Sequence, residues 1–150
     1  MAKAGILIYT IGIHYRDNDM PTLKPALRAQ SPRQRAGRLA EDAALVFLHT
    51  QGHQLVARNF YCRRGEIDLI TLHGQWLVFT EVRWRSRADF GGAASSVTRQ
   101  KQQRIIATAR YFLSRQTSWQ QFFIRFDVML FEGPPAIWQQ RWLQAAFTAF

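Results

Sequence analysis

The segment GEIDLITLHGQWLVFTEVRWR, residues 65–85, limits the possible folds of this chain more than any other. Two runs rich in apolar and β-branched residues flank His73-Gly74-Gln75, which predicts two antiparallel strands joined by a tight turn. Asp68 and Glu81 interrupt these runs, where removing a carboxylate from water is costly. The fold must therefore accommodate two acids inside an apolar hairpin.

Strand periodicity predicts where these acids point. Side chains alternate between the two faces of a strand, so we expect Asp68 to share a face with Ile70. In the second strand, Phe79, Glu81 and Arg83 share a face. Tight pairing of the strands would bring Asp68 close to both Glu81 and Arg83.

Two interpretations of this arrangement remain open. The structural one is a cross-strand ion pair between Asp68 and Arg83, worth a few tenths to about 1 kcal/mol. It leaves Glu81 unexplained, because a second acid adds repulsion to the loss of hydration. The other is a site for Mg²⁺ or Mn²⁺, with oxygen ligands from Asp68, Glu81 and the backbone carbonyl of Val82. Such an ion can activate water and offset charge on a phosphodiester.

The rest of the chain predicts an α/β fold. Residues 1–30 are expected to form a flexible arm, because they lack a period and contain two prolines, and residues 31–150 to form the domain. Within the domain we expect a helix at 31–52, a strand at 53–62, a helix at 98–115, a strand at 122–132, and a short strand with a closing turn or helix at 135–147. With the hairpin, the order is α-β-β-β-α-β, a mixed central sheet flanked by helices. On the last main strand, Asp127 and Arg125 share a face and are expected to form a structural ion pair.

Composition favours an anionic partner. The formal net charge is +10, and only three of the twenty Lys and Arg residues are lysine. Arginine binds phosphate through two parallel hydrogen bonds, so nucleic acid is the first candidate partner and an anionic membrane surface the second. The single cysteine excludes an internal disulfide and fits a reducing, cytoplasmic compartment. No apolar run approaches the roughly 20 residues that span a bilayer.

Basic residues concentrate between Val82 and Arg115, where Asp89 is the only acid. Arg99 and Lys101 fall in the first turn of a predicted helix, where the helix dipole disfavours cations unless an anion binds. A solvated basic face is the alternative. The candidate nucleic-acid-binding residues are Arg63, Arg64, Arg85, Arg87, Ser96, Thr98, Arg99, Lys101 and Arg104.

Three stretches carry a family resemblance. They are GRLAEDAALVFLHTQGHQLVARNFYCRRGEIDLI, LVFTEVRWRS and FGGAASSVTRQKQQRI. GEIDLI followed by EVR is similar to the Asp…Glu-x-Lys signature of the PD-(D/E)XK, or restriction-endonuclease-like, superfamily. Together the stretches resemble the YraN-like family, related to archaeal Holliday-junction resolvases, over about residues 33–131.

The resemblance implies a restriction-endonuclease-like core and a role for each site residue. Asp68 and Glu81 would bind the metal, and Glu41 would take the place of the glutamate that resolvases add. Arg83 stands where a nuclease has lysine. Arginine cannot act as a base, because its pKa exceeds about 12, but it can hold the scissile phosphate.

The function expected from these residues is Mg²⁺- or Mn²⁺-dependent hydrolysis of branched or structured DNA, by a protein that acts as a homodimer like its resolvase relatives. One alternative is a DNA- or RNA-binding module whose nuclease site is degenerate. Another is a protein-interaction scaffold whose charge serves solubility. Binding that weakens steeply with salt would separate the first two from the third.

Overall fold

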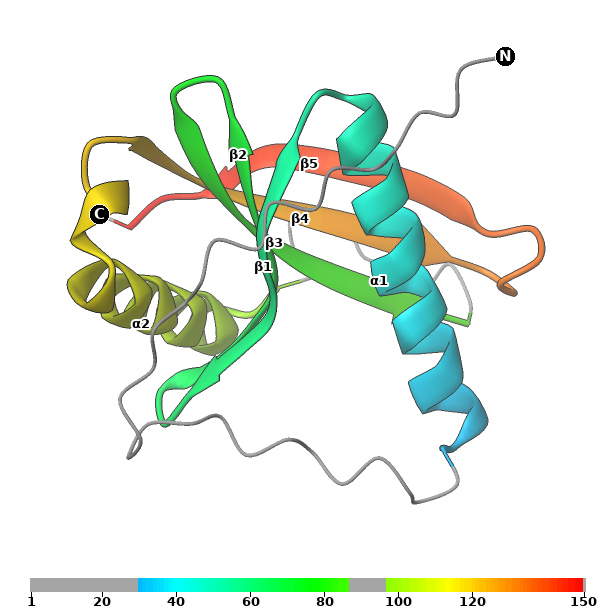
Figure 1. The fold of residues 1–150 in the computed structure, drawn as a ribbon. Coiled ribbons are helices and arrows are strands. Elements are labelled where there is room, and N and C mark those ends of the chain that lie inside the picture. Colours follow the sequence, from blue (N-terminus) through cyan, green and yellow to red (C-terminus); the bar gives the residue numbers. More distant parts are fainter. Residues whose placement is uncertain (1–29, 87–96, 150) are drawn as a thin grey trace, which may run out of the picture.

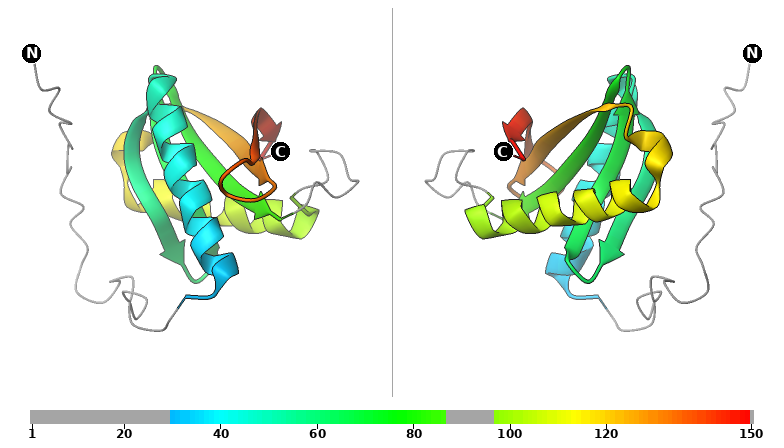
Figure 2. Two further views of the ribbon diagram at one scale, coloured as in Figure 1. Left: turned by 90° about the vertical axis from the view of Figure 1, so that its right-hand side faces the viewer. Right: turned by 90° about the vertical axis from the view of Figure 1, so that its left-hand side faces the viewer.

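The described residues form a five-stranded mixed sheet with a long helix on each face (Figures 1 and 2). The computed structural model describes residues 30–86 and 97–149. The elements in chain order are α1 (Pro32–Thr50), β1 (Gln54–Cys62), β2 (Gly65–His73), β3 (Trp76–Arg85), α2 (Arg99–Arg115), η2 (Thr117–Trp119), β4 (Phe123–Glu132) and β5 (Gln139–Phe147). The predicted mixed α/β class is confirmed. The predicted flexible arm lies outside the described residues, except for Gln30.

The strands lie side by side in the order in which they occur in the chain, β1-β2-β3-β4-β5. Strand β3 runs parallel to β4, and the other three neighbouring pairs are antiparallel. Parallel neighbours need a long crossover connection, and the segment containing α2 supplies it. The hairpin predicted around Gly74 is confirmed, with His73 paired to Trp76.

Helix α1 begins where the sequence predicts. The Ser31 hydroxyl accepts the backbone N–H of Gln34, and the Gln34 side chain accepts the N–H of Ser31, which forms a capping box. Pro32 occupies the first turn, where its missing N–H has no partner to lose. After the helix, Gly52 adopts φ +84°, a left-handed conformation that favours glycine and allows the chain to turn into β1.

Helix α2 starts with Thr98 as its N-cap, and the Thr98 hydroxyl accepts the backbone N–H of Lys101. Its first turn contains no acid, as predicted. The side chains of Ile105, Ala109 and Phe112 point inward and are buried. In the described part of the chain, neither this helix nor any other combines the length and apolarity needed to cross a membrane.

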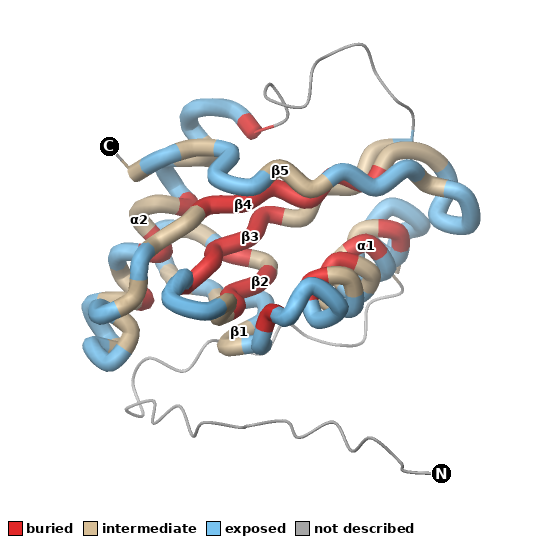
Figure 3. The backbone as a smooth tube through the Cα atoms, turned by 90° about the horizontal axis from the view of Figure 1, so that it is seen from above, coloured by how far each residue is buried: buried red, intermediate tan, exposed pale blue. Residues whose placement is uncertain are grey.

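Two apolar clusters fill the spaces between the sheet and the helices, and the most buried backbone runs through the middle strands (Figure 3). The cluster on the α2 face includes Ile70, Leu77, Phe79, Ile105, Phe112, Phe126, Val128 and Leu130. The cluster on the α1 face consists of Ala40, Ala44, Leu48, Leu69, Met129 and Phe131. Alternate residues of β4 thus enter different clusters, as the alternation of its sequence predicts.

The C-terminal segment differs from its prediction. Instead of a short strand with a closing turn or helix, residues 139–147 form one strand, β5, along β4. The register shifts between Phe126 and Val128, and Ala145 adopts φ +48° at this irregularity. The Asp127 carboxylate accepts the N–H of Ala145, so a side chain of β4 replaces a ladder hydrogen bond and lets β5 continue.

Candidate functional site

Strands β2 and β3 separate at the two predicted acids. Their ladder starts beside the turn and ends at the pair Leu69 and Thr80. Beyond this pair, β2 follows β1 and β3 follows β4, and Figure 1 shows the two strands diverging. Asp68 and Glu81 are the next residues on their strands. The two carboxylates therefore lie where the sheet begins to split.

Regular strand alternation also breaks at Asp68. Ile67 and Ile70 both pack in the cluster on the α2 face, whereas Leu69 packs on the α1 face. In a regular strand, Ile67 and Ile70 would lie on opposite faces. Simple alternation therefore does not describe the direction of the Asp68 side chain, although β2 keeps one register with β1 on both sides of this residue.

The Asp68 carboxylate bridges the split. Its Oδ2 accepts the backbone N–H of Val82 at 2.7 Å, so the side chain takes the place of a cross-strand backbone bond. Burial raises the pKa of Asp68 to about 8, and the charges of Glu81 and Glu41 add to the rise. The Val82 N–H and the charge of Lys101 oppose it. Asp68 thus takes up a proton far more readily than an ordinary aspartate.

Glu81 lies on the α2 face and is 6% exposed. Its Oε2 is 3.3 Å from Lys101 Nζ, across the space between β3 and α2. The two groups are in ionic contact, but their alignment is not that of a hydrogen bond, and among the described residues Oε2 has no hydrogen-bond donor. Burial raises the pKa of Glu81, and the charge of Lys101, its weak hydrogen bonding to the carboxylate and then the charge of Arg83 oppose the rise. A buried oxygen of this kind is poorly satisfied.

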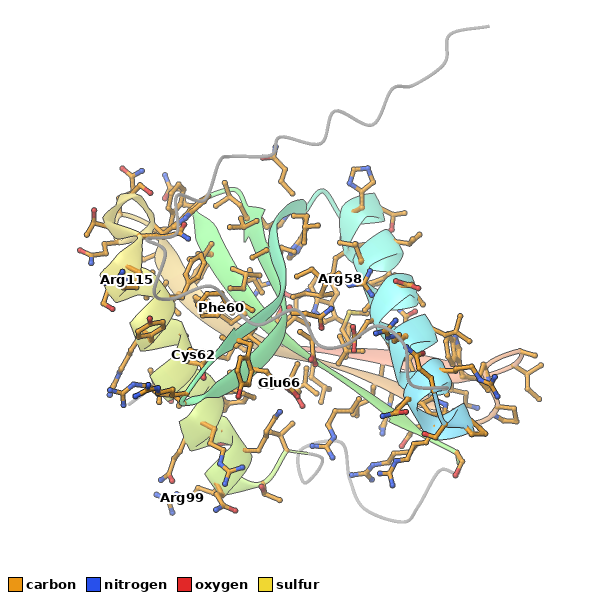
Figure 4. All side chains as sticks on the ribbon, turned by 60° about the horizontal axis from the view of Figure 1, so that its bottom comes forward. Arg58, Phe60, Cys62, Glu66, Arg99 and Arg115 are labelled. Carbon is orange, nitrogen blue, oxygen red and sulfur yellow. The ribbon has the colours of Figure 1, made fainter. Side chains whose placement is uncertain are left out.

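Glu41 reaches the same region from α1. Its Oε2 lies 3.4 Å from Arg58 Nη2, and Asp42 binds the same nitrogen at 2.6 Å. Figure 4 shows Arg58 on β1, between that strand and α1. The charge of Glu41 raises the pKa of Asp68, so these two acids are electrostatically linked. Sequence reasoning missed Arg58, because nothing in the local pattern of β1 indicates its partners.

The oxygen atoms of these acids are of the chemical type that binds a hard divalent cation. Carboxylate oxygens are the ligands that Mg²⁺ and Mn²⁺ prefer, and Glu81 Oε2 is a buried oxygen without a hydrogen-bond donor in the described part of the chain. Within residues 30–86 and 97–149, no group of three or more His, Cys, Asp or Glu side chains is arranged to hold one ion. Asp68 and Glu81 would thus supply two ligands, while Glu41 pairs with Arg58.

Arg83 is half-buried and acts electrostatically on Glu81. Both Asp68 and Arg83 are described, and no ion pair joins them, so the structural interpretation of these residues as a cross-strand pair is wrong. Asp68 instead binds the N–H of Val82. The ion pair that does form is between Glu81 and Lys101, a residue predicted to bind nucleic acid.

The predicted basic residues form a surface beside this site. A Cβ atom on Gly65 would lie 3.2 Å from Thr108 Oγ1 and 3.6 Å from Arg104 Cβ, so only glycine lets the β1–β2 hairpin approach α2 this closely. This contact brings the exposed Arg63 and Arg64 of the hairpin next to Arg104, and Figure 4 shows the neighbouring Cys62 beside α2.

The predicted nucleic-acid-binding residues differ in exposure and in their contacts within the protein. Within the described residues, Arg63, Arg64, Arg99 and Arg104 are exposed and form no ion pair, whereas Arg85 is half-buried at the end of β3. The hydroxyl of Thr98 caps α2, and Lys101 contacts Glu81. Arg87 and Ser96 lie outside the described residues.

Comparisons with known proteins point to one family. The model of the "Uncharacterised protein family UPF0102" matches residues 40–131. The UPF0102 protein of Pseudomonas syringae pv. syringae (strain B728a) is 44% identical over 119 residues, covering 79% of this chain and 97% of the relative. The UPF0102 protein of Alcanivorax borkumensis is 46% identical over 125 residues, covering 82% of this chain and 97% of the relative. The family model includes both acids and the part of α1 from Ala40 onward, which contains Glu41, and this agrees with the YraN-like resemblance of the sequence.

Proposed function

The chain belongs to the UPF0102 family, and from this premise we propose that it is a cytoplasmic, metal-dependent endonuclease of the PD-(D/E)XK superfamily. Its substrate would be branched or structured DNA, which it hydrolyses at a phosphodiester. One observation carries the proposal: two carboxylates with raised pKa values, the half-buried Asp68 and the buried Glu81, lie at a split in the sheet, beside exposed arginines.

The roles of the residues follow from their positions. Asp68 and Glu81 would hold Mg²⁺ or Mn²⁺, with Glu41 assisting from α1 and the carbonyl of Val82 as a further ligand. When bound, the cation would supply Lewis-acid stabilisation of charge on the phosphodiester and activation of water. Arg83 is on the strand that carries Glu81, and its fixed positive charge would hold the scissile phosphate.

The basic surface would bind the DNA backbone. Arg63, Arg64, Arg99 and Arg104 can each take a phosphate oxygen, and the exposed N-terminal turn of α2 favours an anion. Affinity should fall steeply with salt, because each neutralised phosphate releases counterions. A homodimer would present two such sites to a four-way junction, which has matching symmetry.

The test is cleavage of labelled four-way junction, flap and single-stranded DNA with Mn²⁺. We expect Asp68→Asn to reduce the rate by about two orders of magnitude, the scale seen when one group that stabilises a transition state is removed. Glu132→Gln, which changes an acid at the end of β4 that pairs with Arg141, serves as the matched control and should cleave normally. Cleavage that survives Asp68→Asn or EDTA would refute the assignment of the site.

A DNA- or RNA-binding module without turnover is the second candidate. Arg83 in place of lysine favours it, as does the lack of a three-residue metal group among the described residues. Arg83→Lys separates the two candidates. If the wild type binds DNA without cutting it and Arg83→Lys gains metal-dependent cleavage, the protein is a binding module with a degenerate site.

A further inference from the structure

We propose that Lys101 is the counter-ion of the acid pair when no metal is bound. Its ammonium pairs with the Glu81 carboxylate and is displaced when a divalent cation binds. This inference rests on the proposed function only in assuming that Asp68 and Glu81 take a cation. It makes Lys101 a positioning residue of the site, in addition to the phosphate contact predicted from its place in the sequence.

The fold directs Lys101 toward the acids. It is the third residue of α2, and the Thr98 hydroxyl accepts its backbone N–H at 3.3 Å, which fixes the start of the helix. The close contact between Gly65 and Arg104 holds the same helix against the β1–β2 hairpin. From this position Nζ reaches to 3.3 Å from Glu81 Oε2, while 27% of the side chain stays exposed.

Lys101 is the cation that both acids share. Its charge lowers the pKa of Asp68 as well as that of Glu81, against the larger effect of burial. Arg83 opposes the rise at Glu81 and is not among the groups that act on Asp68. The cation in ionic contact with the pair, 3.3 Å from Glu81 Oε2, thus comes from α2, across the space between helix and sheet.

Competition for one oxygen follows from the contact. Among the described residues, Glu81 Oε2 has no hydrogen-bond donor, so the ammonium is its one close partner there. A divalent cation that takes Oε2 as a ligand would place two positive groups on one oxygen, and we infer that their repulsion displaces Nζ. The exposed part of the side chain gives the released ammonium access to solvent, beside the basic surface of α2, where it can bind a phosphate oxygen.

The test is titration of the full chain with Mn²⁺ in the absence of DNA, following free Mn²⁺ by electron paramagnetic resonance. We expect Lys101→Gln to bind Mn²⁺ about tenfold more tightly, because it removes a competing positive charge at close range. Lys101→Arg keeps that charge and should restore wild-type affinity. Arg110→Gln, which removes an exposed charge further along α2, is the control and should match the wild type.

Several outcomes decide the matter. Unchanged or weaker Mn²⁺ binding by Lys101→Gln, with circular dichroism showing a folded variant, overturns the inference, as does a lack of Mn²⁺ binding by both proteins. If Lys101→Gln does not fold, Lys101→Met takes its place, because it also removes the charge: tighter Mn²⁺ binding by the folded variant supports the inference, and unchanged binding contradicts it. If Mn²⁺ binds as expected and no DNA is cut, the proposed nuclease function fails while the counter-ion role of Lys101 stands.

Discussion

Two regions of the sheet bury acids in opposite ways. At the β4–β5 edge, Asp127 is completely buried and accepts four hydrogen bonds. The donors are Arg125 Nε and Nη2 at 2.8 Å each, Trp142 Nε1 at 3.0 Å and the N–H of Ala145 at 3.0 Å. At the split between β2 and β3, Asp68 has the N–H of Val82, and Glu81 has a misaligned contact with Lys101.

The number of donors explains what each acid does. A carboxylate that accepts several hydrogen bonds and a bidentate arginine has its hydration replaced, so Asp127 serves the structure by fixing β5 on β4. Asp68 and Glu81 lack such replacement, and burial raises the pKa values of both. Acids whose pKa values are raised in this way mark binding or catalytic sites more often than stabilising ones.

Removing the saturated acid should have the largest effect on folding. Asp127→Ala would leave Arg125 buried without its partner and free the N–H of Ala145, so we expect a loss of about 3–5 kcal/mol in the free energy of unfolding. Urea denaturation at pH 7 measures this loss. Glu132→Gln, which alters the more exposed pair with Arg141, should change stability by about 1 kcal/mol or less. A loss of under about 1 kcal/mol for Asp127→Ala would mean that the network is not structural.

Replacing an acid at the split should increase the free energy of unfolding instead of lowering it. The pKa of Asp68 is about 8 in the folded protein and 3.8 in the unfolded chain, so between these values the folded state holds the extra proton. Stability of the wild type therefore falls as pH rises from about 4 to 8. Asp68→Asn keeps an oxygen for the N–H of Val82 and cannot ionise, so it should be more stable than the wild type by about 1–3 kcal/mol at pH 8.

Urea midpoints of the wild type and Asp68→Asn at pH 5 and pH 8 check this prediction. The difference between the two proteins should be small at pH 5 and grow toward pH 8. Asp127→Asn is the matched substitution at the β4–β5 edge and should destabilise at both values. If Asp68→Asn destabilises as Asp127→Asn does, the two regions are not different in kind.

Local signals made most of the fold predictable. The capping box at Ser31, the alternation in residues 122–132 and the turn at Gly74 each act over a few residues, and the elements they predict are confirmed. Strand β5 was not predicted in full, because its course depends on a hydrogen bond from Ala145 to Asp127, eighteen residues away in the chain. The ion pair between Arg125 and Asp127 was predicted, since alternation alone places them on one face.

The site was predictable only in part for the same reason. Asp68 and Glu81 stand out because each interrupts an apolar run, and their place at one point of the hairpin follows from the turn. The pairing of Arg58 with Glu41 and of Lys101 with Glu81 was not predicted, since each pair joins two different elements. Such pairs depend on how a helix is rotated against the sheet, which the pattern of one element does not specify.

Beside the β4–β5 region lies a group whose burial makes the fold less stable in acid. His53, between α1 and β1, is 2% exposed, and its ring lies edge-on to Trp142 of β5, with the centroids 5.6 Å apart. Its Nδ1 bonds to the hydroxyl of Thr71, and its ring stacks on His73. Burial, followed by the positive charges of His73 and Arg125, lowers the pKa of His53 from 6.5 to about 4, while Asp127 opposes the change. Between pH 6.5 and about 4, His53 is therefore protonated in the unfolded chain and neutral in the folded protein.

Stability should fall as pH decreases from about 6.5 to about 4, by about 1–2 kcal/mol at pH 5, because the imidazole is protonated in the unfolded chain and neutral in the fold. This loss of stability as pH decreases is opposite in direction to the loss as pH rises that is expected from Asp68. Urea midpoints at pH 7 and pH 5 measure it, read in Asp68→Asn, which removes the opposing contribution of Asp68. His53→Gln should remove the difference, whereas His49→Gln, at an exposed position of α1, should keep it. If the loss between pH 7 and pH 5 persists in His53→Gln, the acid-sensitive group lies elsewhere, and the contrast between an acid-labile edge and an alkali-labile site does not hold.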